Sequence, residues 1–289
     1  MNQSGTTPLT DQQALDFIGT VPPGMPGVDA FMYAPTGMTM EMHMLHIMRG
    51  ITDNVTAYVM PMWMDNTMEQ VNRDGNVFRS TTSGFSDTEF GALWRIHRGD
   101  NDDLILNVGF SAPTANINTS MTMDMGMGMP MTMKDGYTMR LGHGTWDARP
   151  GITYKYYWDR MSLGLQGLID VPLGMNDEQY QVGHEYRANA WVALLLDRQK
   201  KLAATFRVEG LWRGNVVGAD PALNPAMIST ADPNMQGGDY LNFGYGLMYQ
   251  LPGHLGKLIG EYVHPVYQNL RGEQLSTVGA LAVRYDCSF

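Results

Sequence analysis

The last fifteen residues of the chain alternate between apolar and polar side chains up to the terminal Phe289. Leu281, Val283 and Tyr285 share one face of the predicted strand, whereas Arg284 shares the other face with Asp286. Strands of this kind, apolar outside and polar inside, form the transmembrane β-barrels of the bacterial outer membrane. We interpret Phe289 as the C-terminal aromatic signal that the barrel-assembly machinery reads, and we expect the protein in the outer membrane, in contact with its lipid.

Composition excludes several other classes of protein. The 289 residues have a mean hydropathy of −0.23 and contain no stretch approaching eighteen consecutive apolar residues, so spanning helices are not expected. A net charge of −10, with 19 scattered Lys and Arg residues, argues against a nucleic-acid partner. The lone Cys287 permits no internal disulfide and no CxxC site.

The period of two recurs along most of the chain. For example, Leu163 and Leu165 oppose Ser162 and Gln166 within one predicted strand. This pattern predicts an all-β fold, an antiparallel transmembrane β-barrel, with a soluble sandwich as the less favoured alternative. The expected strands are residues 37–49, 55–64, 87–97, 104–112, 145–158, 161–172, 183–196, 201–213, 238–250, 256–265 and 275–289.

The connections alternate between short turns and longer loops, and the longer loops, which include 65–86 and 113–144, are expected outside the cell. Eleven strands cannot close an antiparallel barrel, so we expect about twelve in the full-length protein. Residues 1–36 lack the features of a signal peptide, and we expect them to be an extracellular loop or N-terminal segment that followed a missing signal peptide and first strand. A plug inside the barrel is the alternative for 1–36, and residues 37–289 form the predicted barrel.

Methionine is unusually frequent, with 25 residues, many in the segments GMTMEMHMLHIM and MTMDMGMGMPMTM. The second segment lies in a predicted external loop, and thioether sulfurs favour soft cations such as Cu(I). The alternative is that these adaptable apolar side chains pack over the barrel mouth or into the membrane interface. The candidate Cu(I) or Ag(I) ligands are Met121, Met123, Met125, Met127, Met129, Met131 and Met133.

Charged residues on the predicted inner faces of the strands are the other candidate chemistry. They either line a pathway for solutes or cross-link a narrow barrel through ion pairs. The set comprises Glu41, His43, Glu89, Arg95, Asp147, Arg149, Lys155, Glu185, Arg187, Arg207, Glu209, Glu261, Arg284 and Asp286. The chain contains no GxSxG, HExxH or GxxxxGK[ST] motif, so we do not expect an enzyme, although His143, Asp147 or His184 near the outer rim would be the residues that a barrel hydrolase recruits.

Several segments together resemble a family of bacterial outer-membrane β-barrels described as putative transporters of the meta-pathway of phenol degradation. The resemblance runs over most of residues 30–289 and rests on APTGMTMEMHMLHIMRGITDNVTAYVMPMW, LGHGTWDARPGITY, ADPALNPAMISTADP with GGDYLNFGYG, and PVYQNLRGEQL with the terminal Phe289. It implies a barrel of roughly twelve strands and the passage of small aromatic or other hydrophobic molecules. The family offers no catalytic residues to carry over.

The function expected from these observations is an outer-membrane channel for small-molecule solutes, without a cofactor. Two alternatives stay open. One is a surface protein that captures Cu(I) or Ag(I) through its Met-rich loop, and the other is a structural barrel that docks another envelope protein.

Overall fold

The fold is an antiparallel β-structure in which successive strands of the chain pair in order. The computed structural model describes residues 1–17, 31–124, 130–253 and 255–288. Within these ranges no helix is long and apolar enough to cross a membrane. The main strands are β3 (Tyr33–Met44), β4 (Ile47–Gly50), β5 (Val55–Met60), β6 (Met62–Asn72), β7 (Val77–Phe85), β8 (Thr88–Arg98), β9 (Asp102–Ala112), β12 (Asp147–Tyr157), β13 (Met161–Pro172), β15 (Glu185–Leu195), β16 (Leu202–Arg213), β18 (Gly238–Gln250), β19 (Lys257–Leu275) and β20 (Ala280–Asp286).

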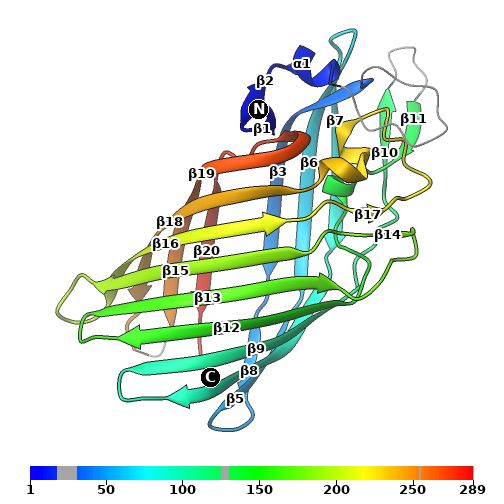
Figure 1. Cartoon of the computed structure of the whole chain (residues 1–289). Coiled ribbons are helices and arrows are strands. Elements are labelled where there is room, and N and C mark those ends of the chain that lie inside the picture. Colours follow the sequence, from blue (N-terminus) through cyan, green and yellow to red (C-terminus); the bar gives the residue numbers. More distant parts are fainter. Residues whose placement is uncertain (18–30, 125–129, 254, 289) are drawn as a thin grey trace.

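Shorter elements gather at the end of the sheet that carries the long loops, called here the long-loop end (Figure 1). They are β1 (Asn2–Gly5), β2 (Thr7–Leu9), α1 (Asp11–Leu15), β10 (Ser120–Asp124), β11 (Pro130–Lys134), η1 (Tyr137–Met139), β14 (Tyr180–Gln181), β17 (Val217–Gly218), η2 (Ser229–Ala231) and η3 (Pro233–Met235). The β1 strand pairs with the far end of β19, where Asn2 lies opposite Leu275.

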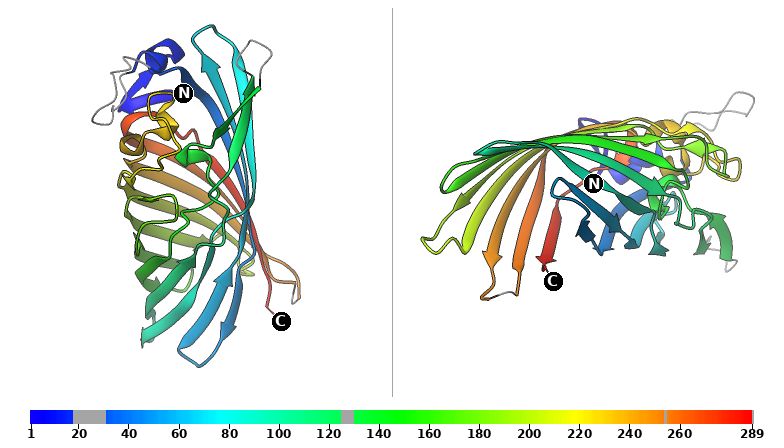
Figure 2. Two further views of the ribbon diagram at one scale, coloured as in Figure 1. Left: turned by 90° about the vertical axis from the view of Figure 1, so that its right-hand side faces the viewer. Right: turned by 90° about the horizontal axis from the view of Figure 1, so that it is seen from below.

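Eleven strands of the described chain follow one another from β4 to β20, in the order β4, β5, β8, β9, β12, β13, β15, β16, β18, β19 and β20. The sheet curls, and the view from below in Figure 2 shows β20 coming round toward the β3–β4 region. In the described ranges β20 pairs only with β19, β3 pairs only with β6, and β4 pairs only with β5. Because the order contains an odd number of antiparallel strands, β4 and β20 run in the same direction, as the parity argument from sequence predicted.

The prediction that residues 65–86 form a long loop is wrong. This segment continues two strands of the sheet as a hairpin, in which β6 pairs with β7 from Trp63 opposite Phe85 to Val71 opposite Val77. The hairpin projects beyond the curled sheet at the long-loop end (Figure 1). Its inner face carries polar and Met side chains instead of a continuous apolar run, which is why periodicity alone did not separate it from a loop.

A buried ion-pair cluster, called here the rim cap, ties together three loop segments at the long-loop end: the one with β11 and η1, the one with β14, and the one that follows β17. Asp220 Oδ2 accepts from Arg140 Nη2 at 2.6 Å and lies 2.9 Å from Lys134 Nζ. The Arg140 guanidinium also lies over the rings of Tyr137 and Tyr180, at 5.2 and 4.9 Å from their centroids. Burial alone would raise the pKa of Asp220, but the hydrogen bonds from Lys134 and Arg140 hold this pKa below its ordinary value.

We predict that Asp220→Asn loosens the rim cap. The substitution leaves the buried Arg140 without its carboxylate partner, whereas Lys134 keeps Glu178 at 2.6 Å, and removing one partner of a buried ion pair costs about 3–5 kcal/mol of local stability. In the unchanged protein the Asp220 contribution is complete above the unfolded pKa of about 3.9 and is lost as pH falls through the depressed folded pKa. The measurement is the rate of proteolysis in residues 130–146 and 214–237 of the folded protein. Asp74→Asn, in an exposed turn, is the control, and equal rates in the two variants would contradict the prediction.

Candidate functional site

The strand registers assign each predicted lumen residue to one face of the sheet. Residues directly opposite one another in an antiparallel pair share a face. The twelve predicted residues from Glu89 onward lie on the inner face; they are Glu89, Arg95, Asp147, Arg149, Lys155, Glu185, Arg187, Arg207, Glu209, Glu261, Arg284 and Asp286. The outer face of the same strands is apolar and exposed, with Leu281, Val283 and Tyr285 as examples on β20.

Glu41 and His43 are the exceptions, and their predicted inward orientation is wrong. Glu41 lies opposite Asp65, and His43 lies opposite Trp63, which packs against Phe85 on the outer face of the hairpin. The Met side of β3 faces inward instead, since Met38 lies opposite the buried Met68. Met40, Met42 and Met44 share this inward side and stay exposed to the lumen, so an apolar face did not identify the lipid side here.

A chain of hydrogen bonds, called here the polar belt, crosses the inner face of the sheet. Gln166 Nε2 donates to Thr153 Oγ1 at 3.0 Å, and Asn189 Nδ2 donates to Gln166 Oε1 at 3.3 Å. Arg207 Nη1 donates to Asn189 Oδ1 at 3.2 Å. Arg207 also binds both carboxylate oxygens of Glu261 at 2.9 Å, the strongest geometry for such a pair. The polar belt thus links β12, β13, β15, β16 and β19.

The belt continues to β18 through a second carboxylate. Arg207 Nη1 donates to Glu209 Oε2 at 2.7 Å, and Asn242 Nδ2 donates to Glu209 Oε1 at 3.0 Å. One arginine therefore serves two glutamates, and the belt carries one net negative charge when both are ionised. Neutral amides and a hydroxyl make up the rest of it.

Further ion pairs lie above and below the belt. Toward the long-loop end, Glu185 accepts from Arg187 at 2.6 Å and from Arg213 at 3.0 Å. Toward the opposite end, Arg95 lies 3.5 Å from Asp103. On the edge strand, Asp286 lies 3.4 Å from Lys257 and 3.1 Å from Arg284. Most inner-face charges therefore have an oppositely charged neighbour.

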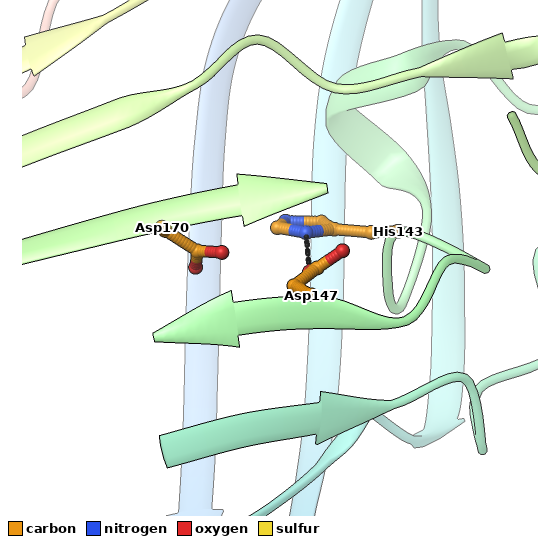
Figure 3. Close-up of side chains that lie close together, drawn as sticks. All are labelled: His143, Asp147 and Asp170. Atoms are coloured by element: carbon orange, nitrogen blue, oxygen red, sulfur yellow. Dashed lines mark hydrogen bonds and ion pairs between the residues drawn. The ribbon is translucent and has the colours of Figure 1, made fainter. Parts of the chain in front are cut away.

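A second group of charges, called here the rim cluster, lies where β8, β12 and β13 meet the long loops. It comprises Asp87, Glu89, His143, Asp147, Arg149 and Asp170. Figure 3 shows His143, Asp147 and Asp170 gathered there from a loop, β12 and β13. His143 Nδ1 lies 2.7 Å from Asp147 Oδ2, and Asp147 is fully buried. Arg149 pairs with Glu89 and, at 2.6 Å, with Asp170.

The rim cluster holds His143 firmly and favours its charged form. Asp87 Oδ2 accepts from the backbone N–H of His143 at 2.6 Å, and Asp147 Oδ1 accepts from the Thr145 hydroxyl at 2.5 Å. Burial by itself would lower the pKa of His143. The hydrogen bond to Asp147 and the negative charges around the ring outweigh burial and raise this pKa above its ordinary value.

Sequence reasoning missed several of these residues. The alternation in the sequence places Gln166 and Asp170 on the inner face, but Asp87 and Asn189 were not recognised. His143 and Asp147 were noted as residues near the outer rim, and the structure brings them together. His184 is not part of the rim cluster.

Two large aromatic side chains also face inward, each over glycine. The Trp191 ring covers Gly164 of β13, where an added Cβ would overlap the ring. The Tyr58 hydroxyl lies over Gly91 and Gly109 and donates to Asn107 Oδ1 at 3.1 Å. Glycine makes room for an aromatic side chain from a neighbouring strand, and the inner face gains apolar surface beside its polar belt.

The Met-rich segment is a β-hairpin where the structure describes it. Met121 lies opposite Met133, and Met123 lies opposite Met131. Met121 is 6% exposed and belongs to an apolar cluster with Tyr33 and Ile228, against which Met133 also packs. These contacts favour packing for this pair, and metal binding by the segment stays a prediction. Met125, Met127 and Met129, like Phe289, lie outside the described residues.

We predict that Gly164→Ala lowers the free energy of unfolding by about 1–3 kcal/mol, because the new methyl group must displace the Trp191 ring. Gly167→Ala, on the opposite face of the same strand, is the matched control, since its added Cβ meets nothing within 4 Å. We expect the control to change stability by no more than about 0.5 kcal/mol. Denaturant titration of the folded protein in detergent measures both, and equal losses would show that Trp191 does not fix this part of the barrel.

Comparisons with known proteins agree with this geometry. A family model described as "Putative MetA-pathway of phenol degradation" matches residues 50–265. An outer membrane channel from Pseudomonas putida F1 has a similar crystal structure, with a TM-score of 0.53, 16% identity, and coverage of 85% of this chain and 82% of that one. No curated protein matches the chain. The protein is a β-barrel of the bacterial outer membrane and belongs to the family described as "Putative MetA-pathway of phenol degradation".

Proposed function

We propose that the protein is a channel that passes small solutes, aromatic or otherwise hydrophobic ones among them, along its inner face. The observation that supports this most is the polar belt. Its one arginine pairs with both of its glutamates, and its amides and hydroxyl offer hydrogen-bond donors and acceptors to a passing solute.

The inner face suits a phenol-like solute in two respects. Trp191 and Tyr58 provide apolar ring surface, and Asn189 and Gln166 provide partners for a hydroxyl group. The excess of carboxylates in the belt and in the rim cluster opposes anions. Neutral and cationic solutes are therefore the proposed cargo, and the family description is in keeping with phenolic ones.

The expectation that the chain is not an enzyme stays a prediction. His143, Asp147 and Thr145 lie together, but Thr145 donates to the aspartate and not to the histidine. In the described contacts no base therefore activates this hydroxyl as a nucleophile.

We predict that Arg207→Gln makes the channel more selective for cations. The substitution leaves Glu209 and Glu261 without their shared cation and adds one negative charge to the belt. At roughly 8 Å in a solvated lumen, one unit of charge changes the interaction energy with a passing monovalent ion by about 0.5–1 kcal/mol. This corresponds to about a 2- to 5-fold rise in the cation-to-anion permeability ratio. The measurement is the reversal potential across a planar bilayer under a salt gradient.

Arg198→Gln is the matched control, because it removes the same charge from an exposed turn between β15 and β16. It should leave the reversal potential unchanged. Adding phenol to the wild-type channel should reduce or interrupt its current. Absence of conductance in the folded wild type, or a reversal potential that Arg207→Gln does not move, would overturn the proposed route along the belt.

A further inference from the structure

The rim cluster contains more negative charge than its cations compensate. Four carboxylates, those of Asp87, Glu89, Asp147 and Asp170, surround one permanent cation, the Arg149 guanidinium, and His143. Even a protonated His143 leaves two negative charges in excess. Asp147 is fully buried and Asp87 is 4% exposed, so water screens these charges poorly.

The uncompensated charge coincides with an unused ligand atom. Asp170 Oδ2 is bound by Arg149 at 2.6 Å, whereas Asp170 Oδ1 is buried and has no hydrogen-bond partner in the described structure. A buried oxygen of this kind costs free energy unless a donor or a cation occupies the space in front of it. No such partner is present among the described residues.

Two further residues offer ligand atoms near the Asp170 carboxylate. His143, Asp147 and Asp170 each offer one ligand atom, and these three atoms lie within 4.8 Å of one another. Atoms bound to one ion at about 2.0–2.2 Å lie closer together than this, so small side-chain rotations are needed. The three residues come from different elements, a loop, β12 and β13, and Figure 3 shows their side chains converging.

We propose that His143, Asp147 and Asp170 form a binding site for a divalent transition-metal ion such as Zn²⁺ at the extracellular mouth of the barrel. An imidazole nitrogen with two carboxylate oxygens suits Zn²⁺, whereas Ca²⁺ and Mg²⁺ prefer all-oxygen sites. Three protein ligands leave a fourth position for water or another ligand. A ligating imidazole is neutral, so binding displaces any second proton from His143 and leaves three negative charges in excess, of which the ion compensates two.

Neighbouring groups already hold the three ligands in place, as the outer contacts of metal sites do. The Thr145 hydroxyl donates to Asp147 Oδ1, and Arg149 fixes Asp170 through its other oxygen. Asp87 holds the backbone of His143. This arrangement is independent of the Met-rich hairpin and of Cys287, whose sulfur ligands would favour softer ions.

The test is zinc binding by the full chain, folded in detergent and freed of metal with a chelator. Isothermal titration with ZnCl₂ should show one saturable site per chain. His143→Gln and Asp170→Asn should each weaken binding at least about tenfold. His184→Gln, at the same end of the barrel, and Asp177→Asn, in an exposed loop, are matched controls and should bind as the wild type does.

X-ray absorption of the zinc-loaded wild type tests the same site without any substitution. It should show nitrogen and oxygen bound to the metal and no sulfur. Sulfur bound to zinc, binding that His143→Gln leaves unchanged, or no saturable binding by the folded wild type would each overturn the proposal. None of these measurements depends on whether the barrel conducts solutes.

Discussion

The backbone hydrogen-bond ladder is the constraint on which the rest of this structure depends. In the hydrocarbon region of a membrane no water is present to satisfy backbone N–H and C=O groups, so each spanning strand needs partners on its two sides. The ladder from β4 to β20 meets this need for every strand between those two. The same ladder fixes the registers, and the registers decide which side chains face lipid and which face the lumen.

These registers place charged side chains on the inner face, and removing such groups from bulk water costs free energy. Charged groups removed from bulk water must be paired or hydrogen-bonded. The polar belt meets this condition, since Arg207 serves Glu209 and Glu261 while amides occupy the remaining hydrogen bonds. In the rim cluster the described residues leave negative charge and one Asp170 oxygen without a partner, and this difference from the polar belt motivates the proposed metal site.

The seam between β20 and the β3–β4 edge is the one interruption of the ladder in the described barrel. His46, between β3 and β4, lies within electrostatic reach of Arg284 and Asp286, so the two edges approach each other. The two edges run in the same direction and share no ladder, and one further strand running opposite to both would pair with each of them. An unpaired edge is a template for another strand, so the alternative that the barrel docks another envelope protein stays a prediction.

Much of the fold could be predicted from the sequence, because a period of two is a local property. Alternation placed β8, β9, β12, β13, β15, β16 and β18 within a few residues of their observed ends, and it assigned the inward phase of residues such as Arg207 and Glu261. The alternation failed where the more apolar face of a strand does not face lipid. On β3 the Met side chains point inward, so the predicted orientation of Glu41 and His43 is wrong. The inner face of the β6–β7 hairpin mixes Met with polar residues, so its sequence resembles that of a loop.

The sequence by itself determined the class of the protein, because alternating strands with a polar inner face are stable only where lipid covers the other face. Only the tertiary structure decided which inward residues meet. His143 and Asp147 are four residues apart, but Asp170 lies on the neighbouring strand, and the sequence does not give the distances among the three side chains. The curvature of the sheet and the packing of the long loops set that distance, and both depend on contacts between segments far apart in the chain.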